Sequence, residues 1–243
     1  MSEFGPLAPP PPGGYPPLRP PPPAPNGLAI AARVFAVLLG LVSLGMFFAA
    51  FPARHSYRVA AVKGDDVADV LTAYELLPLV WLVFALVAYI LTCLWLFECR
   101  ARVEALAPQI PQRRSKIWVW LCWIVPVVNL WFPYQVVRDL RRGSHPGRNP
   151  SNALVGWWLA AWIGFCIVDR FASITLPFEG EIDIARINAT LVPTQAISTA
   201  LCLCALVFWL RIISDIMRGQ AELRPAPMPP QPQWPAQQPA HWS

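Results

Sequence analysis

The stretch Trp120–Val137, WLCWIVPVVNLWFPYQVV, decides how this chain is folded. It is apolar enough to enter a lipid bilayer, but it carries Pro126, Asn129 and Pro133, and proline removes a backbone hydrogen-bond donor from a helix. Such a segment either crosses the membrane as a kinked helix or enters it and returns to the same side. The two outcomes give different topologies for the whole chain.

The composition of the chain is that of a membrane protein. Of its 243 residues, 56 % are hydrophobic and only 14 % are charged, and the mean hydropathy is +0.43. A helix needs about 20 apolar residues to cross a hydrocarbon core about 30 Å thick. Five runs approach this length, at about 28–51, 76–97, 117–137, 153–176 and 191–213.

The distribution of lysine and arginine favours four crossings over five, because these residues concentrate in short cytoplasmic loops. The loops 98–116 and 138–153, on either side of the proline-containing run, carry nine of them. The loops 52–75 and 169–190 are mixed or acidic. If all five runs cross, the basic residues divide evenly between the two faces. If 117–137 returns, one face collects 14 of the 19.

We therefore predict an all-α integral membrane protein with four transmembrane helices, at 28–51, 76–97, 153–176 and 191–213, and a proline-broken re-entrant or interfacial segment at 117–137. The alternative is five transmembrane helices with a kink at Pro126. The four-helix arrangement places a transmembrane domain at 27–218 and both termini on the cytoplasmic side of the cell membrane.

The two ends of the chain are rich in proline. Residues 1–26 hold 12 of the 29 prolines and residues 221–243 hold another seven. Such segments favour polyproline II and cannot bury a core, so we predict disordered tails at 1–26 and 219–243. They serve either as spacers or as ligands of a protein partner that recognises proline.

The residues of the proline-containing run recur at helical spacing. Trp123, Pro126, Leu130 and Pro133 follow one another at three and four residues, with Asn129 adjacent, so a helical conformation places them on one face. Aromatic residues lie toward both ends of the run, where such rings favour the headgroup level. The candidate structural or functional motif is Trp123, Pro126, Asn129, Pro133 and Tyr134.

This motif, followed by a basic stretch and by Gly156–Trp158, resembles a family of actinobacterial multi-pass membrane proteins known as a domain of unknown function, DUF4328. The likeness covers roughly residues 80–215. Upstream, the family pattern Trp-x-x-Arg-Ala-x-x-Asn corresponds to Phe97, Arg100, Ala101 and Glu104. Arg100 and Ala101 match the pattern, whereas Phe97 replaces its tryptophan and Glu104 replaces its asparagine. The resemblance implies an integral membrane protein, and the family has no assigned activity.

The sequence offers no recognisable catalytic or cofactor chemistry. Its three histidines fall in predicted loops or tails, and it lacks the H-E-x-x-H, G-x-S-x-G and phosphate-binding glycine motifs. We expect no enzyme activity, no metal and no cofactor. The basic loops indicate contact with anionic inner-leaflet lipids and not with nucleic acid. The candidate lipid-contacting residues are Arg113, Arg114, Lys116, Arg138, Arg141 and Arg142.

Two features of the apolar runs remain. Asp169 and Arg170 form a candidate intramembrane charge pair if the fourth helix continues to Leu176, or mark its outer edge if the helix ends at Val168. In the first run, Ala32, Ala36 and Gly40 form a small-residue face. Such a face lets another helix approach closely, and we assign it to packing within the chain.

We predict a non-enzymatic scaffold or assembly module of the cytoplasmic membrane, partnered by membrane lipids. The alternative is a small transporter or channel in which the broken segment around Pro126 and Asn129 lines a solvated path. Conduction predicts that Asn129 faces a water-filled cavity near Asp169 or Glu75. A scaffold predicts that Asn129 bonds a neighbouring backbone in a dry interface.

Overall fold

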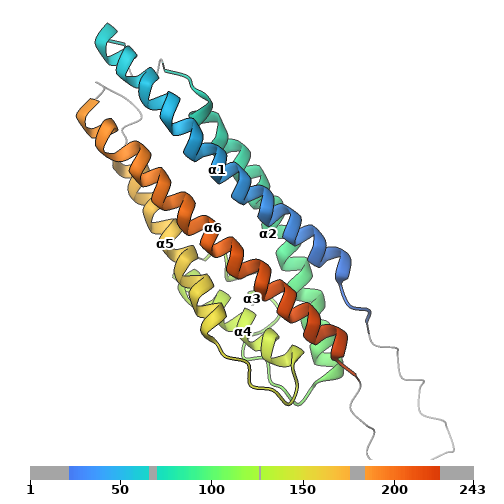
Figure 1. Cartoon of the computed structure of the whole chain (residues 1–243). Coiled ribbons are helices and arrows are strands. Elements are labelled where there is room, and N and C mark those ends of the chain that lie inside the picture. The colour runs from blue at the N-terminus through green and yellow to red at the C-terminus, as the bar shows by residue number, and fades with distance from the viewer. Residues whose placement is uncertain (1–21, 66–69, 126, 176–183, 225–243) are drawn as a thin grey trace, which may run out of the picture.

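The computed structural model describes residues 22–65, 70–125, 127–175 and 184–224. Within these ranges the chain is helical and contains no strand (Figure 1). Most of both predicted tails, and Pro126, lie outside the described residues. The elements are α1 (Asn26–Lys63), α2 (Ala73–Leu106), α3 (Trp118–Leu121), the short 3₁₀ turn η2 (Val128–Leu130), α4 (Phe132–Ser144), α5 (Ala153–Thr175) and α6 (Ile184–Glu222).

Four long helices form the body of the molecule. Figure 1 shows α1 running beside α2, and α6 packing against both α1 and α5. Short α3 and α4 lie near one end of the bundle, where α4 contacts α2, α5 and α6. The four long helices, α1, α2, α5 and α6, are long and apolar enough to cross a membrane. The chain therefore has the predicted all-α fold with four candidate membrane-spanning helices.

Local sequence signals determine where α1 ends and where α2 begins. Gly64, with a φ of 79°, ends α1, and its left-handed conformation directs its N–H to the carbonyl of Ala60 or Ala61. Thr72 begins α2 with a capping box: its hydroxyl accepts from the Tyr74 N–H at 3.2 Å, and the Glu75 carboxylate accepts from the Thr72 N–H at 2.7 Å. These two caps allow α1 and α2 to pack as antiparallel neighbours.

Three helices are longer than a bilayer is thick. At about 1.5 Å per residue, the 38, 34 and 39 residues of α1, α2 and α6 extend about 57, 51 and 58 Å, against a hydrocarbon core of about 30 Å. The bundle must therefore project beyond the lipid. Beyond the predicted span of α1, a small second core joins the end of α1 to the start of α6 through Ala60, Ile187 and Leu191.

The segment 117–137 enters the bundle and returns to the same end. The residues just before it are bound to the residues just after it: the Arg113 N–H donates to Oδ2 of Asp139 at 3.3 Å, and the Gln112 amide donates to the Asp139 carbonyl at 3.4 Å. Between these points the described backbone makes α3, a turn and η2, each too short to cross a membrane. Among the described residues the structure thus has four candidate membrane-spanning helices and a broken segment, and 117–137 does not form a fifth long helix.

The small-residue face of α1 packs against α6 within the same chain. Ala32 and Ala36 are buried. A Cβ atom on Gly40 would lie 2.6 Å from Cδ2 of Leu206, which is closer than carbon atoms approach. One turn further, the Thr199 hydroxyl donates to the Ser43 carbonyl at 3.1 Å. The absence of a side chain at Gly40 lets the Leu206 side chain of α6 lie against the backbone of α1.

This contact predicts that Gly40→Leu destabilises the bundle by about 1–3 kcal/mol, because overpacking a tight interface forces the helices apart. The midpoint of thermal unfolding in detergent micelles should fall. Gly45→Leu, five residues further along α1 where a Cβ meets nothing within 4 Å, is the matched control. Equal midpoints for the two variants would contradict close packing at Gly40.

Candidate functional site

Side chains of α2 support the backbone of the broken segment. The Tyr89 hydroxyl donates to the Trp120 carbonyl at 2.9 Å, and the Cys93 thiol donates to the Val119 carbonyl at 3.3 Å. The Trp123 indole N–H donates to the same Val119 carbonyl at 3.0 Å. The next charged residue of α2 after Tyr89 comes nine residues later, which is about 13 Å along the helix. The segment therefore reaches well into the apolar part of the bundle.

Trp123 belongs to a tryptophan cluster in which Trp209 contacts the other three rings. The Trp123 ring lies 5.7 Å from Trp158 of α5 and 6.3 Å from Trp209 of α6, both edge-on. Trp158 and Trp209 stack on each other at 5.0 Å, and Trp95 of α2 meets Trp209 at 6.0 Å. These offset and edge-to-face arrangements are the favourable ones for aromatic pairs. The motif tryptophan thus joins the broken segment to α5 and α6.

Asn129 lines a cavity of about 350 Å³. Its backbone N–H donates to the Val125 carbonyl at 2.8 Å. Its side-chain Oδ1 is sealed from solvent and has no hydrogen-bond partner in the described part of the chain. The cavity wall comes from α1, α2, the broken segment, α5 and α6, and we call it the aromatic cavity because five tryptophans line it: Trp81, Trp123, Trp158, Trp162 and Trp209.

The other members of the motif belong to α4. Pro133 occupies the first turn, where its missing N–H leaves no helical bond unmade, and it is buried. Tyr134 is half-buried and carries the Arg138 guanidinium 5.3 Å from its ring centre. The structure therefore divides the motif: Trp123 and Asn129 face the aromatic cavity, whereas Pro133 and Tyr134 belong to a helix that packs against the ends of α2 and α6. Pro126 lies outside the described residues.

Helix α4 is wedged into the bundle and does not lie on its surface. Each of its 13 residues is buried or half-buried. Two glycines permit the close approach: a Cβ on Gly143 would collide with the Val103 side chain of α2, and a Cβ on Gly219 of α6 would collide with the Ser144 carbonyl. A side chain at either position would push α4 outward.

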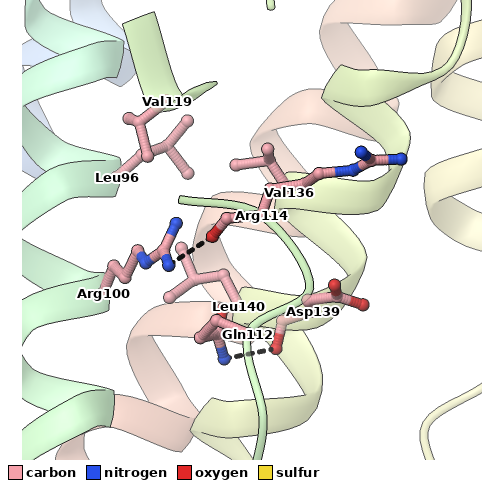
Figure 2. A pocket seen from close by; sticks show the side chains of 8 residues that line it. All are labelled: Leu96, Arg100, Gln112, Arg114, Val119, Val136, Asp139 and Leu140. Carbon is pink, nitrogen blue, oxygen red and sulfur yellow. Dashed lines mark hydrogen bonds between the residues drawn. The ribbon is translucent and has the colours of Figure 1, made fainter. Parts of the chain in front are cut away.

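A buried carboxylate joins α4 to the loop before the broken segment. Asp139 is only 6 % exposed, and its Oδ1 accepts two hydrogen bonds from Arg138, at 3.0 and 3.1 Å. Figure 2 shows the adjoining contacts, in which Arg100 of α2 donates to the Arg114 carbonyl and Gln112 donates to the Asp139 carbonyl. These groups enclose a space of about 10 Å³, about the volume that one water molecule requires.

A second polar cluster joins α4 to α6. Arg141 pairs with Asp215, and the His145 ring lies 3.9 Å from the same carboxylate. The fully buried Gln220 amide donates to the Ser144 hydroxyl at 2.9 Å and to the Cys99 carbonyl of α2 at 3.2 Å. Three helices are therefore bonded through one side chain.

The basic residues predicted to contact lipid have partners inside the chain in four of six cases. Arg138 and Arg141 pair with Asp139 and Asp215, as described above. Lys116 lies 2.7 Å from Glu104, and the Arg114 guanidinium donates to Gln135 at 2.8 Å while lying 3.9 Å from the Phe132 ring centre. Arg113 is exposed and Arg142 is half-buried. Lipid contact stays a prediction, with Arg113 and the exposed side of Lys116 best placed for it.

Asp169 and Arg170 lie within α5, which continues past Val168 to Thr175. Both residues are exposed, and neither lines the aromatic cavity. The alternative that this helix ends at Val168, with the two charged residues at its outer edge, is therefore not what the structure shows. Whether the two charges act as a pair inside the membrane stays a prediction.

Sequence reasoning missed the carboxylates that hold α4. Asp139 follows an arginine in the sequence and Asp215 lies between Arg211 and Arg218, and from sequence alone a buried ion pair looks the same as a solvated one. Gln220 falls inside the predicted disordered tail, although α6 continues through it to Glu222. The available signal was Gly143 and Gly219, since glycine within a helix often marks close packing. Among the described residues, no group of three or more histidine, cysteine, aspartate or glutamate side chains could hold a metal.

Replacing the buried carboxylate should be costly. Asp139→Ala leaves the 13 %-exposed Arg138 side chain without its partner, and we expect a loss of about 3 kcal/mol in the free energy of unfolding in micelles. Glu222→Ala removes a pair at 3.9 Å whose side chains are 66 % and 74 % exposed, and should change stability by less than about 0.5 kcal/mol. A similar loss in both variants would show that Asp139 does not anchor α4.

Comparison with known proteins identifies a family but no characterised relative. No curated protein and no solved structure matches the chain. The family described as Domain of unknown function (DUF4328) matches residues 58–218, which include the four helices in whole or in part, the broken segment and α4. Because this match covers well over half of the sequence, the chain belongs to the DUF4328 family.

Proposed function

We propose that the protein is a non-enzymatic scaffold or assembly module of the cell membrane, which holds its two proline-rich tails together at one membrane face. The observation that carries the proposal is Arg102 of α2. Its guanidinium donates one hydrogen bond to the Pro22 carbonyl, just before α1, and another to the Gln220 carbonyl near the end of α6, at 3.3 Å. One side chain thus binds the two points from which the tails leave the bundle.

The rest of that end supports the same role. Figure 1 shows the start of α1, the end of α6 and α4 at one end of the bundle. The cluster around Asp139 and Asp215 bonds the helices of this end to one another, which suits a platform that fixes the spacing between two proline-rich ligands. Tethering two weak binding segments at adjacent points raises their effective concentration for a partner. A protein that recognises proline-rich peptides at two sites is the partner that fits best.

We place the platform on the cytoplasmic side. Of the 19 lysines and arginines, 14 belong to the end that carries the tails in the four-helix topology, and cytoplasmic segments carry such an excess. Anionic inner-leaflet lipids are then the lipids that meet the exposed basic side chains, each adding on the order of 1 kcal/mol near the surface.

A transport role is the second candidate, favoured by the cavity beside the broken segment. Transporters commonly use broken helices to form their binding sites. Here, however, neither Glu75 nor Asp169 lines the cavity, and its wall is mainly tryptophan, alanine and leucine. An ion path requires charged side chains or carbonyl groups along its wall. A scaffold is therefore the better account of the chain as a whole.

Single cysteines in a cysteine-free background test the orientation. Gln109 lies in the loop between α2 and α3 and Asp65 follows α1 at the opposite end, and both are exposed. In intact cells, an impermeant thiol reagent should label Asp65→Cys, and should label Gln109→Cys only after permeabilisation. The reverse pattern would place the tails outside the cell and refute a cytoplasmic platform.

Proximity labelling in cells tests the scaffold role itself. A labelling enzyme fused to the chain should mark a set of neighbours that is lost when the prolines of both tails are replaced by serine. Arg102→Ala should reduce that set several-fold, since it frees the two tail exits from each other. Arg148→Ala, which removes a guanidinium with a 74 %-exposed side chain from the same face, is the control. If the same set of neighbours is labelled after the tail prolines are replaced by serine, the scaffold role is refuted.

A further inference from the structure

The aromatic cavity has the size of a ligand pocket. It is partly open to the surface of the bundle and measures about 350 Å³. Ligand pockets range from about 300 to 1,000 Å³, so the cavity lies at the lower end of that range. Ala85 and Ala88 of α2 and Ala205 of α6 create the space, because larger residues at these lining positions would fill it. Its size suits a single-chain molecule.

The wall of the cavity excludes a charged ligand. Its lining contains no aspartate, glutamate, lysine, arginine or histidine. The nearby basic residues Arg100 and Arg114 belong instead to the separate, water-sized space beside Asp139 (Figure 2). A charged headgroup in the aromatic cavity would have no counter-charge, and an uncompensated charge away from water is strongly unfavourable. The ligand is therefore neutral, with most of its surface apolar.

Two polar atoms of the lining residues lack partners. Oδ1 of Asn129 is an acceptor and Nε1 of Trp162 is a donor, and each is sealed from solvent with no hydrogen bond to the described residues. Buried polar groups are nearly always hydrogen-bonded, so each exception calls for an explanation. A hydroxyl group both donates and accepts, so it can bond either atom once a small rotation of that side chain turns the atom toward the cavity. Neither a water-filled path nor a dry backbone cap, the two roles considered for Asn129, matches this environment.

The cavity is accessible from the surface that faces lipid. Ile124, which lines it, is 63 % exposed. Val127 and Leu130, on the same segment, are also largely exposed. At another edge of the cavity, Trp81 of α2 meets Phe165 of α5, with ring centres 5.7 Å apart. A molecule dissolved in the bilayer can therefore enter beside Ile124 without passing through water.

We propose that the aromatic cavity binds a single-chain neutral lipid with a hydroxyl headgroup, such as a long-chain alcohol or a monoacylglycerol. The hydroxyl group bonds the Asn129 amide or the Trp162 indole, and the aliphatic chain packs along the tryptophan wall. This inference is independent of the scaffold role, since the cavity and the tail exits involve different residues.

Quenching of tryptophan fluorescence by dodecanol carrying a terminal bromine tests the proposal with the full chain in micelles. Five of the 12 tryptophans line the cavity, so bound probe quenches a saturable fraction of the emission. Bromododecane, which lacks the hydroxyl group, is the matched probe. We expect the alcohol to bind about tenfold more tightly than the alkane, as one well-made hydrogen bond in a dry site allows.

Three variants separate specific binding from partition into the micelle. Asn129→Leu should lower the affinity for the alcohol to that for the alkane, whereas Asn149→Leu, in an exposed loop, should change neither. Ala205→Phe should weaken both probes by filling the cavity. Leu39→Phe fills the cavity from α1, and it replaces Ala205→Phe in this test if that variant does not fold. Unsaturable quenching, equal affinity for the two probes, or an Asn129→Leu variant that binds the alcohol normally would each overturn the proposal.

Discussion

The backbone of the broken segment is the constraint on which the structure depends. At membrane depth no water is present to bond free N–H and C=O groups, so irregular backbone persists only where protein covers it. Here the turns of α3 and η2 satisfy most of the described N–H groups internally, and Tyr89, Cys93 and Trp123 bond the carbonyls of Val119 and Trp120. The donors on α2 fix the depth of the segment. The rings of α5 and α6 fix its orientation.

After the broken segment returns, α4 lies beside the ends of α2 and α6. The charged side chains of α4 are therefore placed among buried groups. Removing two charges from water costs several kcal/mol each, and their attraction offsets that cost only with good geometry and further hydrogen bonds. Asp139 meets the condition through Arg138 and the Arg113 N–H, and Asp215 through Arg141. Buried ion pairs add little net stability but strongly disfavour other arrangements. The charges thus specify where α4 docks.

The sequence is sufficient to predict the four candidate membrane-spanning helices, because the length of an apolar run can be read without knowledge of its neighbours in space. It is also sufficient for the contact of Ala32, Ala36 and Gly40, because spacing alone identifies a small face. It is not sufficient for α4, whose alternation of apolar and basic residues is that of a helix lying on a headgroup layer. Only the fold brings Asp215 and Gln220 from 70 or more residues away to the residues of α4. The cavity is equally invisible in sequence, since it results from alanines on helices that become neighbours only in the bundle.

Two side chains hold Lys116 in the loop before the broken segment. They are Phe97 and Glu104, where the family resemblance implied tryptophan and asparagine: the Lys116 ammonium lies 5.9 Å from the Phe97 ring centre and 2.7 Å from the Glu104 carboxylate. Glu104 also accepts from Arg100 at 2.9 Å, and Arg100 in turn bonds the Arg114 carbonyl. The departures therefore act together to hold the loop that leads into the broken segment. A tryptophan and an asparagine could offer a ring and an amide oxygen at these positions, but not a negative charge.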